Sequence, residues 1–116
     1  MRTFKLKDSI YKTHITIFIG SLADYNKRLC QFNLKEQQDD EVKGEFQRFS
    51  LNNKGYYWVF VRGGQSRSET INTLAHELVH LVMCRFDDCS VPISRKNDEV
   101  FAYFYASLLE QAINKI

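Results

Sequence analysis

The alternation of hydrophobic and polar residues predicts three strands in the first half of the chain. Residues 13–19 place three isoleucines on one face at a period of two, which is typical of a half-buried strand ending at Gly20. Two further strand-like runs, 46–51 and 56–61, flank the Asn-Asn-Lys-Gly segment 52–55. Asn and Gly favour tight turns, so these two runs predict an antiparallel hairpin.

Hydrophobic residues at helical spacing predict three helices. The first would run from an N-cap at Ser21 toward Phe32, with an apolar stripe on one side. The second would open at Ser66 or Ser68, because Ser66 and Glu69 have the spacing of a capping box. The expected helices are therefore 21–32, a segment from 66 or 68 to 84–86, and 98–114.

The order strand, helix, hairpin, helix, helix predicts an α+β fold. The chain has 116 residues and 44% hydrophobic residues, which is enough for one core. No repeat or Gly/Pro-rich linker divides it, so we expect residues 1–116 to form a single domain.

Charge and cysteine content narrow the function classes. The formal net charge is +2 with the two signs interspersed, so a strong electrostatic signal for nucleic acid or an anionic membrane is missing, although a local patch is not excluded. Three cysteines without a Cys-x-x-Cys pair indicate reduced thiols. With no apolar leader or membrane-length run, we expect a cytoplasmic protein that has no nucleic-acid or membrane partner.

The second predicted helix contains His76-Glu77-Leu78-Val79-His80, an HExxH sequence. Histidines at i and i+4 lie one turn apart on one helix face, so both imidazoles can reach one metal ion. The intervening Glu77 can accept a proton from a water molecule that the metal activates. The alternative is a pair of histidines that is merely solvated or hydrogen-bonded.

A catalytic zinc site needs a third protein ligand. His14 lies on a distant predicted strand, and Phe86 occupies the position where a longer HExxH pattern would supply histidine. Asp87 is a further possibility, although Met83 replaces the glycine that normally turns the chain there. The remaining candidates are Glu99, Asp98, Asp88, Cys84 and Cys89.

Glu99 is the preferred candidate. Eighteen residues, 81 to 98, separate it from His80, which leaves room for a helix end, a loop and the first turn of the next helix. Here the sequence resembles the gluzincin metallopeptidases, in which HExxH is followed by a glutamate on the next helix. More narrowly, residues 73–80 and 98–103 resemble the small zincin-like metallopeptidases encoded by phages and prophages.

This resemblance implies one Zn²⁺ per chain, held by His76, His80 and Glu99, with Glu77 as the general base. It also implies a minimal zincin-like fold: a small, mostly antiparallel sheet on the HExxH helix, with the following helix supplying the third ligand. The edge strand beside the metal would lie within the hairpin, with Tyr56 to Val61 as the preferred run, and a peptide substrate could add there as another strand.

Two neighbouring residues are candidates for supporting the ligands. Tyr103 follows Glu99 by one helical turn and could hold a ligand histidine or reach the site as a donor. Thr73 precedes His76 by three residues on the same face. The structural alternative for both is ordinary packing.

These observations predict a zinc-dependent hydrolase, most simply a peptidase. The alternative is a non-catalytic zinc-containing module that binds a host or phage protein. The intact Glu77 favours the enzyme, whereas the short chain favours the binding module, because larger gluzincins use a further domain to wall the cleft.

Overall fold

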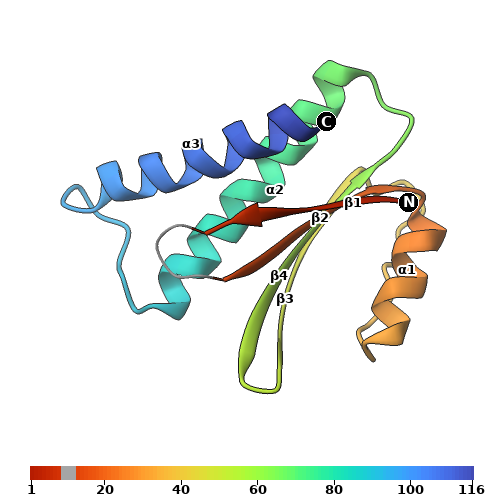
Figure 1. Cartoon of the computed structure of the whole chain (residues 1–116), viewed down its shortest axis with the longest axis horizontal. Helices are drawn as coiled ribbons and strands as arrows, with labels where there is room; N and C mark the ends of the chain where they lie inside the picture. The colour runs from red at the N-terminus through yellow and green to blue at the C-terminus, as the bar shows by residue number, and fades with distance from the viewer. Residues whose placement is uncertain (9–12) are drawn as a thin grey trace.

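The computed structural model describes residues 1–8 and 13–116 and confirms the α+β class. A four-stranded sheet separates one helix on one face from two on the other (Figure 1). The elements are β1 (Arg2–Lys7), β2 (His14–Gly20), α1 (Leu22–Gln31), β3 (Gly44–Leu51), β4 (Lys54–Arg62), α2 (Arg67–Asp88) and α3 (Asp98–Lys115).

The sheet is mixed, with strand order β1-β2-β4-β3. Two of its pairings, β1 with β2 and β3 with β4, are antiparallel, while β2 and β4 run parallel. The β3–β4 hairpin closes through Asn52 and Asn53, whose φ values of 53° and 64° suit the tight turn. The predicted hairpin and the predicted strand at 13–19 are thus confirmed.

The prediction that Tyr56 to Val61 forms the edge strand is wrong. This run lies in β4, which pairs with β2 on one side and β3 on the other. Its side chains are apolar on both faces, because Tyr57 and Val59 face α2 while Trp58 and Phe60 face α1. A strand that is hydrophobic on both faces belongs inside a sheet. The edge strand of the hairpin is β3, which carries Glu45, Gln47 and Arg48.

β1 is an element that the hydrophobic pattern did not predict. It is only six residues long and mixes basic and apolar side chains. Its outer edge is covered by α3, because the side chain of Gln111 accepts from the backbone N–H of Lys7 (2.8 Å) and donates to the Lys7 carbonyl (3.1 Å). A single side-chain amide therefore replaces the next strand of the sheet.

Two apolar clusters hold the helices to the sheet. The larger lies between the sheet and α2 and α3, and it includes Ile17, Val59, Leu78 and Leu108, all fully buried. The smaller lies under α1, where the ring of Tyr25 stacks on Phe60 with centroids 4.5 Å apart. The larger cluster fixes the buried face of α2 and so decides which face of the HExxH helix points outward.

Candidate metal centre

The helix that carries the HExxH sequence is long and capped. Ser66 is its N-cap, and its hydroxyl accepts from the backbone N–H of Glu69 at 3.2 Å, as the capping-box spacing predicts. The helix continues to Asp88, two residues beyond the predicted end near Cys84 to Phe86. The HExxH residues therefore lie in the middle of α2, far from either frayed end.

His76 and His80 project together from the exposed face of α2. Their Nε2 atoms are 3.2 Å apart, and the ring centroids lie 4.9 Å apart. Two imidazole nitrogens bound to one tetrahedral zinc at 2.0–2.1 Å would be about 3.3 Å apart. The pair therefore has the separation of a two-nitrogen chelate. The same separation also suits a hydrogen bond between the two rings, with one Nε2 donating.

Glu77 lies on the inner side of the same turn and is 9% exposed. Burial raises the pKa of its carboxyl, the nearby His76 and His80 oppose part of that rise, and Glu45 adds to it. A carboxylate whose pKa is raised toward neutrality is a better proton acceptor than a fully solvated one.

β3 passes unusually close to this turn of α2. A Cβ atom built on Gly44 would lie 2.5 Å from the methyl of Thr73 and 3.2 Å from Cγ of Glu77. Gly44 is therefore the residue that lets the sheet edge approach the HExxH helix.

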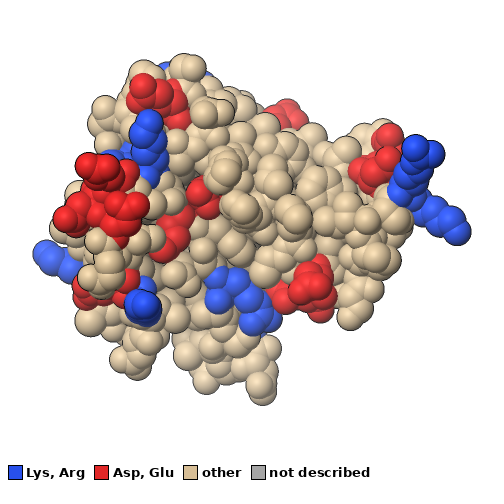
Figure 2. Space-filling view, turned by 180° about the vertical axis from the view of Figure 1, so that it is seen from behind, with Lys and Arg blue, Asp and Glu red and all other residues tan. Residues whose placement is uncertain are grey.

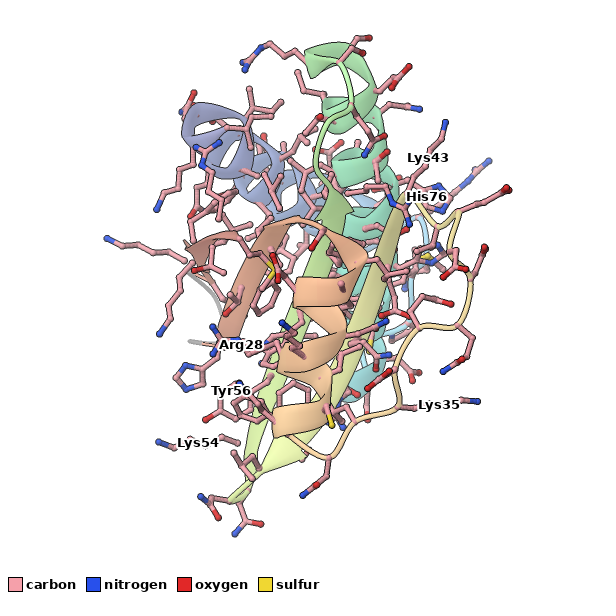
Figure 3. The ribbon with its side chains drawn as sticks, turned by 90° about the vertical axis from the view of Figure 1, so that its right-hand side faces the viewer. Arg28, Lys35, Lys43, Lys54, Tyr56 and His76 are labelled. Atoms are coloured by element: carbon pink, nitrogen blue, oxygen red, sulfur yellow. The ribbon has the colours of Figure 1, made fainter. Side chains whose placement is uncertain are left out.

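The approach of β3 leaves a surface cavity of about 300 Å³ beside the HExxH turn. Its lining includes Lys43, Thr73, His76 and Glu77. Figure 3 shows His76 next to Lys43 at one end of the sheet.

Thr73 shares this cavity, but its hydroxyl is 3.3 Å from Oε1 of Gln65, to which it donates. Gln65 in turn donates to the carbonyl of Arg62 at 2.7 Å, so it ties the start of α2 to the end of β4. The structure thus gives Thr73 a partner other than a ligand histidine.

The structure places Glu99 on the exposed first turn of α3. Within residues 1–8 and 13–116, no three or more His, Cys, Asp or Glu side chains form a group that could hold a metal ion. The structure thus brings the imidazoles of His76 and His80 together, with Glu77 on the inner side of the same turn, but it does not gather Glu99 with them. Tyr103 is 73% exposed on the same helix.

The contact of α3 with the HExxH turn is made by Tyr105. Its hydroxyl donates to the backbone carbonyl of Ala75 at 3.0 Å, immediately before His76. Sequence reasoning missed this residue because either tyrosine among the six consecutive aromatic and alanine residues 101–106 carries no signal of its own. Only the packing of α3 on α2 distinguishes it from Tyr103.

Of the other ligand candidates, Asp88 is already engaged. It accepts hydrogen bonds from the hydroxyl of Tyr57 and from Nε of Arg48 at 3.0 Å, and Cys84 Sγ lies 3.9 Å from it. Cys89 caps the C-terminus of α2, and Asp98 lies beside Glu99 on the exposed start of α3. The hydrogen bonds of Asp88 with Tyr57 and Arg48 fix the end of α2 to the β3–β4 hairpin.

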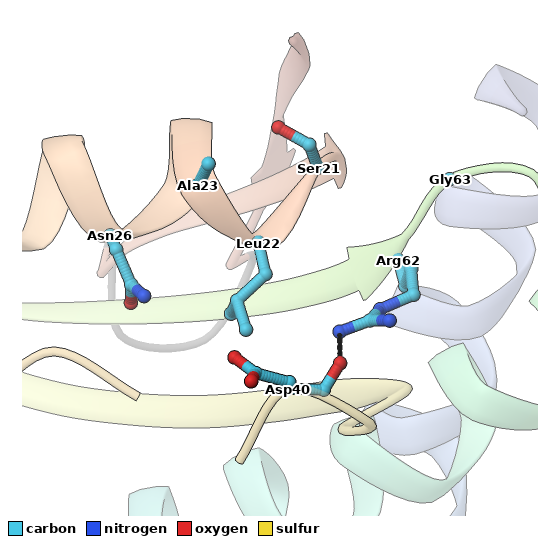
Figure 4. Close-up of a pocket in the computed structure, with 7 residues that line it drawn as sticks. All are labelled: Ser21, Leu22, Ala23, Asn26, Asp40, Arg62 and Gly63. Atoms are coloured by element: carbon cyan, nitrogen blue, oxygen red, sulfur yellow. Dashed lines mark hydrogen bonds between the residues drawn. The ribbon is translucent and has the colours of Figure 1, made fainter. Parts of the chain in front are cut away.

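Another cavity, of about 480 Å³, lies between the start of α1 and the end of β4 (Figure 4). The guanidinium of Arg62 donates to the carbonyl of Asp40 across it. It contains no histidine or cysteine and a single carboxylate, so it lacks the donors of a metal site.

The side opposite to the view of Figure 1 carries charges of both signs. Figure 2 shows Asp and Glu mainly on its left, Lys and Arg among them and at other places, and large uncharged areas. None of the described helices has the length and hydropathy needed to span a membrane.

No protein-family model, curated protein or solved structure matches this chain significantly.

Proposed function

We propose that the chain is a zinc-dependent hydrolase, and specifically a metallopeptidase. The observation that carries the proposal is the 3.2 Å separation of the Nε2 atoms of His76 and His80, beside the buried carboxyl of Glu77. The two imidazoles supply nitrogen donors that suit zinc, and a carboxylate from Glu99 would complete the nitrogen and oxygen donor set that the ion prefers.

When bound, zinc would polarise a scissile carbonyl and lower the pKa of a water molecule to about 7. Glu77 would accept the proton of the attacking water and pass it to the leaving amine. Its position on the inner side of the helix, in the cavity shared with His76, suits both transfers.

The proposed third ligand is Glu99. Because the described residues do not group it with the two histidines, ligation requires the first turn of α3 to approach the exposed face of α2. The later part of α3 is held by Tyr105 on α2 and by Gln111 on β1, so the adjustment would fall on the start of the helix.

The proposed substrate is an extended peptide that adds to β3. In a hairpin with a two-residue turn, every second residue of a strand directs its backbone N–H and C=O toward the partner strand. Lys43 is one of these residues, because its carbonyl accepts from the backbone N–H of Arg62 at 2.8 Å. Gly44, Phe46 and Arg48 therefore direct their backbone N–H and C=O groups to the open edge. A peptide paired there would pass beside Glu77.

The alternative is a non-catalytic module that binds a host or phage protein. Its support is that α3 covers the outer edge of β1, which leaves β3 as the edge of the described sheet open to a partner strand. The two functions share a surface and differ in whether Glu77 performs chemistry.

Metal analysis and peptide turnover would test the proposal together. We expect about one zinc per wild-type chain, and Glu99→Ala should lose most of it, whereas Glu110→Ala, an exposed glutamate on the same helix, should retain it. Glu77→Gln should keep the zinc while slowing peptide cleavage by roughly 100-fold or more.

Three results would contradict a part of this proposal. Full zinc occupancy in Glu99→Ala would reject Glu99 as a ligand, and the absence of zinc from the wild type would reject the metal centre. Zinc-loaded protein that cleaves no member of a mixed peptide library would favour the binding module over the peptidase.

A further inference from the structure

The sheet face that carries α1 is only partly covered by that helix. α1 packs on Phe18, Trp58 and Phe60. Beside the C-terminal part of α1, the same face holds a groove of about 340 Å³, lined by Lys5, His14, Thr16, Arg28, Tyr56 and Trp58 among others. Figure 3 shows Arg28 and Tyr56 in this region, at the other end of the sheet from His76.

A row of parallel aromatic rings crosses the sheet at this end. His14 on β2 stacks with Tyr56 on β4 (centroids 5.0 Å apart, planes at 20°), and Tyr56 stacks with Phe49 on β3 (5.2 Å, 11°). His14 ends the row on the side of β1, and its side chain is exposed. A planar ring could therefore extend the row by stacking on the outer face of this imidazole.

Basic side chains surround the end of that row. Lys5 and Arg28 line the groove, and Lys7 pairs across the sheet with His14, so it lies on the same face just beyond the imidazole. All three are exposed, and none takes part in the ion pairs found within residues 1–8 and 13–116. The groove lining contains no carboxylate.

Aromatic rings and unpaired cations on one open groove match the chemistry of a nucleotide chain. We propose that this groove binds single-stranded nucleic acid, with a base stacked on His14 and the flanking phosphates at Lys5, Lys7 and Arg28. A single strand is required because a base inside a duplex has no free face. The groove lies away from His76 and Glu77, so this binding is independent of the proposed zinc chemistry.

The near balance of charge over the whole sequence argued against a nucleic-acid partner. The fold changes that expectation locally, because β1 and α1 bring Lys5, Lys7 and Arg28 to one face, around a groove whose described lining contains no carboxylate.

The proposal can be tested with a fluorescein-labelled single-stranded oligothymidylate at low salt. The chain has one tryptophan, Trp58, which lines the groove, so binding should change both oligonucleotide anisotropy and protein fluorescence. His14→Ala should weaken binding by roughly fivefold or more, whereas His14→Phe, which keeps a stacking ring, should retain it. The double variant Lys5→Ala/Arg28→Ala should lower the slope of log Kd against log salt by about 1.4.

A matched control removes two exposed cations outside the groove, Lys35 and Lys96. Lys35→Ala/Lys96→Ala has the same net charge as the groove variant and should bind almost as the wild type does. Equal losses in the two double variants, undiminished binding by His14→Ala, or no binding by the wild type would overturn the proposal. Equally tight binding of polyglutamate would assign the groove to acidic peptides instead.

Discussion

At the scale of single residues, the chemistry of α2 depends on which side chains are buried and which are exposed. His76 and His80 are exposed and converge, whereas Glu77 between them is almost buried. One turn of helix thus offers two ligands to solvent and keeps a carboxyl with a raised pKa against the sheet. About two turns further toward the C-terminal end of α2, the pKa of Asp88 is shifted in the opposite direction.

Partial burial alone would raise the pKa of Asp88, but hydrogen bonds from Tyr57 and Arg48, and the charges of Arg48 and Arg85, lower it below its ordinary value. A carboxyl whose pKa is lowered by folding stabilises the native state above its unfolded pKa, and this contribution is lost as the pH falls through the folded value.

We therefore expect Asp88→Asn to lower the free energy of unfolding by about 1–2 kcal/mol at neutral pH. The difference from the wild type should shrink in acid, below about pH 4, where the wild-type carboxyl also becomes neutral. Denaturant titrations across pH would measure it. Asp87→Asn, the exposed neighbour in the same turn, serves as the control, and an equal effect there would contradict a specific role for Asp88.

At the scale of elements, the decisive contact is that of β3 with α2. Gly44 allows β3 to approach Thr73 and Glu77 closely, because the Cβ atom of any other residue at this position would overlap the Thr73 methyl. The same approach creates the cavity at the HExxH turn and brings the open sheet edge beside Glu77. A side chain at this one position would separate the two elements.

Gly44→Ala should cost about 1–3 kcal/mol, because its Cβ would overlap the Thr73 methyl. Adding Thr73→Ser, which removes that methyl, should recover part of the loss. Thermal unfolding of the single and double variants would measure both effects. Gly55→Ala is the control, since a Cβ there meets only the ring of Tyr57 at 3.6 Å, an ordinary contact. If Thr73→Ser gives no recovery, the overlap is not the cause.

At the scale of the whole molecule, α3 joins the two ends of the chain to the HExxH helix. Gln111 bonds to the backbone of β1, Tyr105 bonds to α2, and Arg67 donates to the terminal carbonyl of Ile116 at 3.4 Å. A ligand that binds the folded site alone therefore stabilises all of these elements together.

Zinc should raise the melting temperature of the wild type. At a free zinc concentration 100 times Kd, the stabilisation is about 2.7 kcal/mol, or roughly 8–15 °C for a chain of this size. A chelator should reverse the shift, and His80→Ala should abolish it. His14→Ala, which removes an exposed histidine on β2, should leave it unchanged; a shift that survives in His80→Ala would place the zinc elsewhere.

The sequence by itself determined the elements whose signals are local. The Ser66 cap, the Asn52-Asn53 turn, the alternation of residues 13–19 and the one-turn spacing of His76 and His80 depend on neighbours within a few residues. Each of these predictions is confirmed, because backbone geometry alone converts such a pattern into structure.

Only the tertiary structure decided how those elements sit beside one another. The strand order places β4 inside the sheet and β3 at its edge. The packing of α3 lets Gln111 bond to the backbone of the short β1. Glu99 does not join the two histidines in a metal-binding group within the described residues. The fold also gathers Lys5, Lys7 and Arg28 beside His14. These contacts join residues far apart in the chain, and their energies depend on packing that no local pattern encodes.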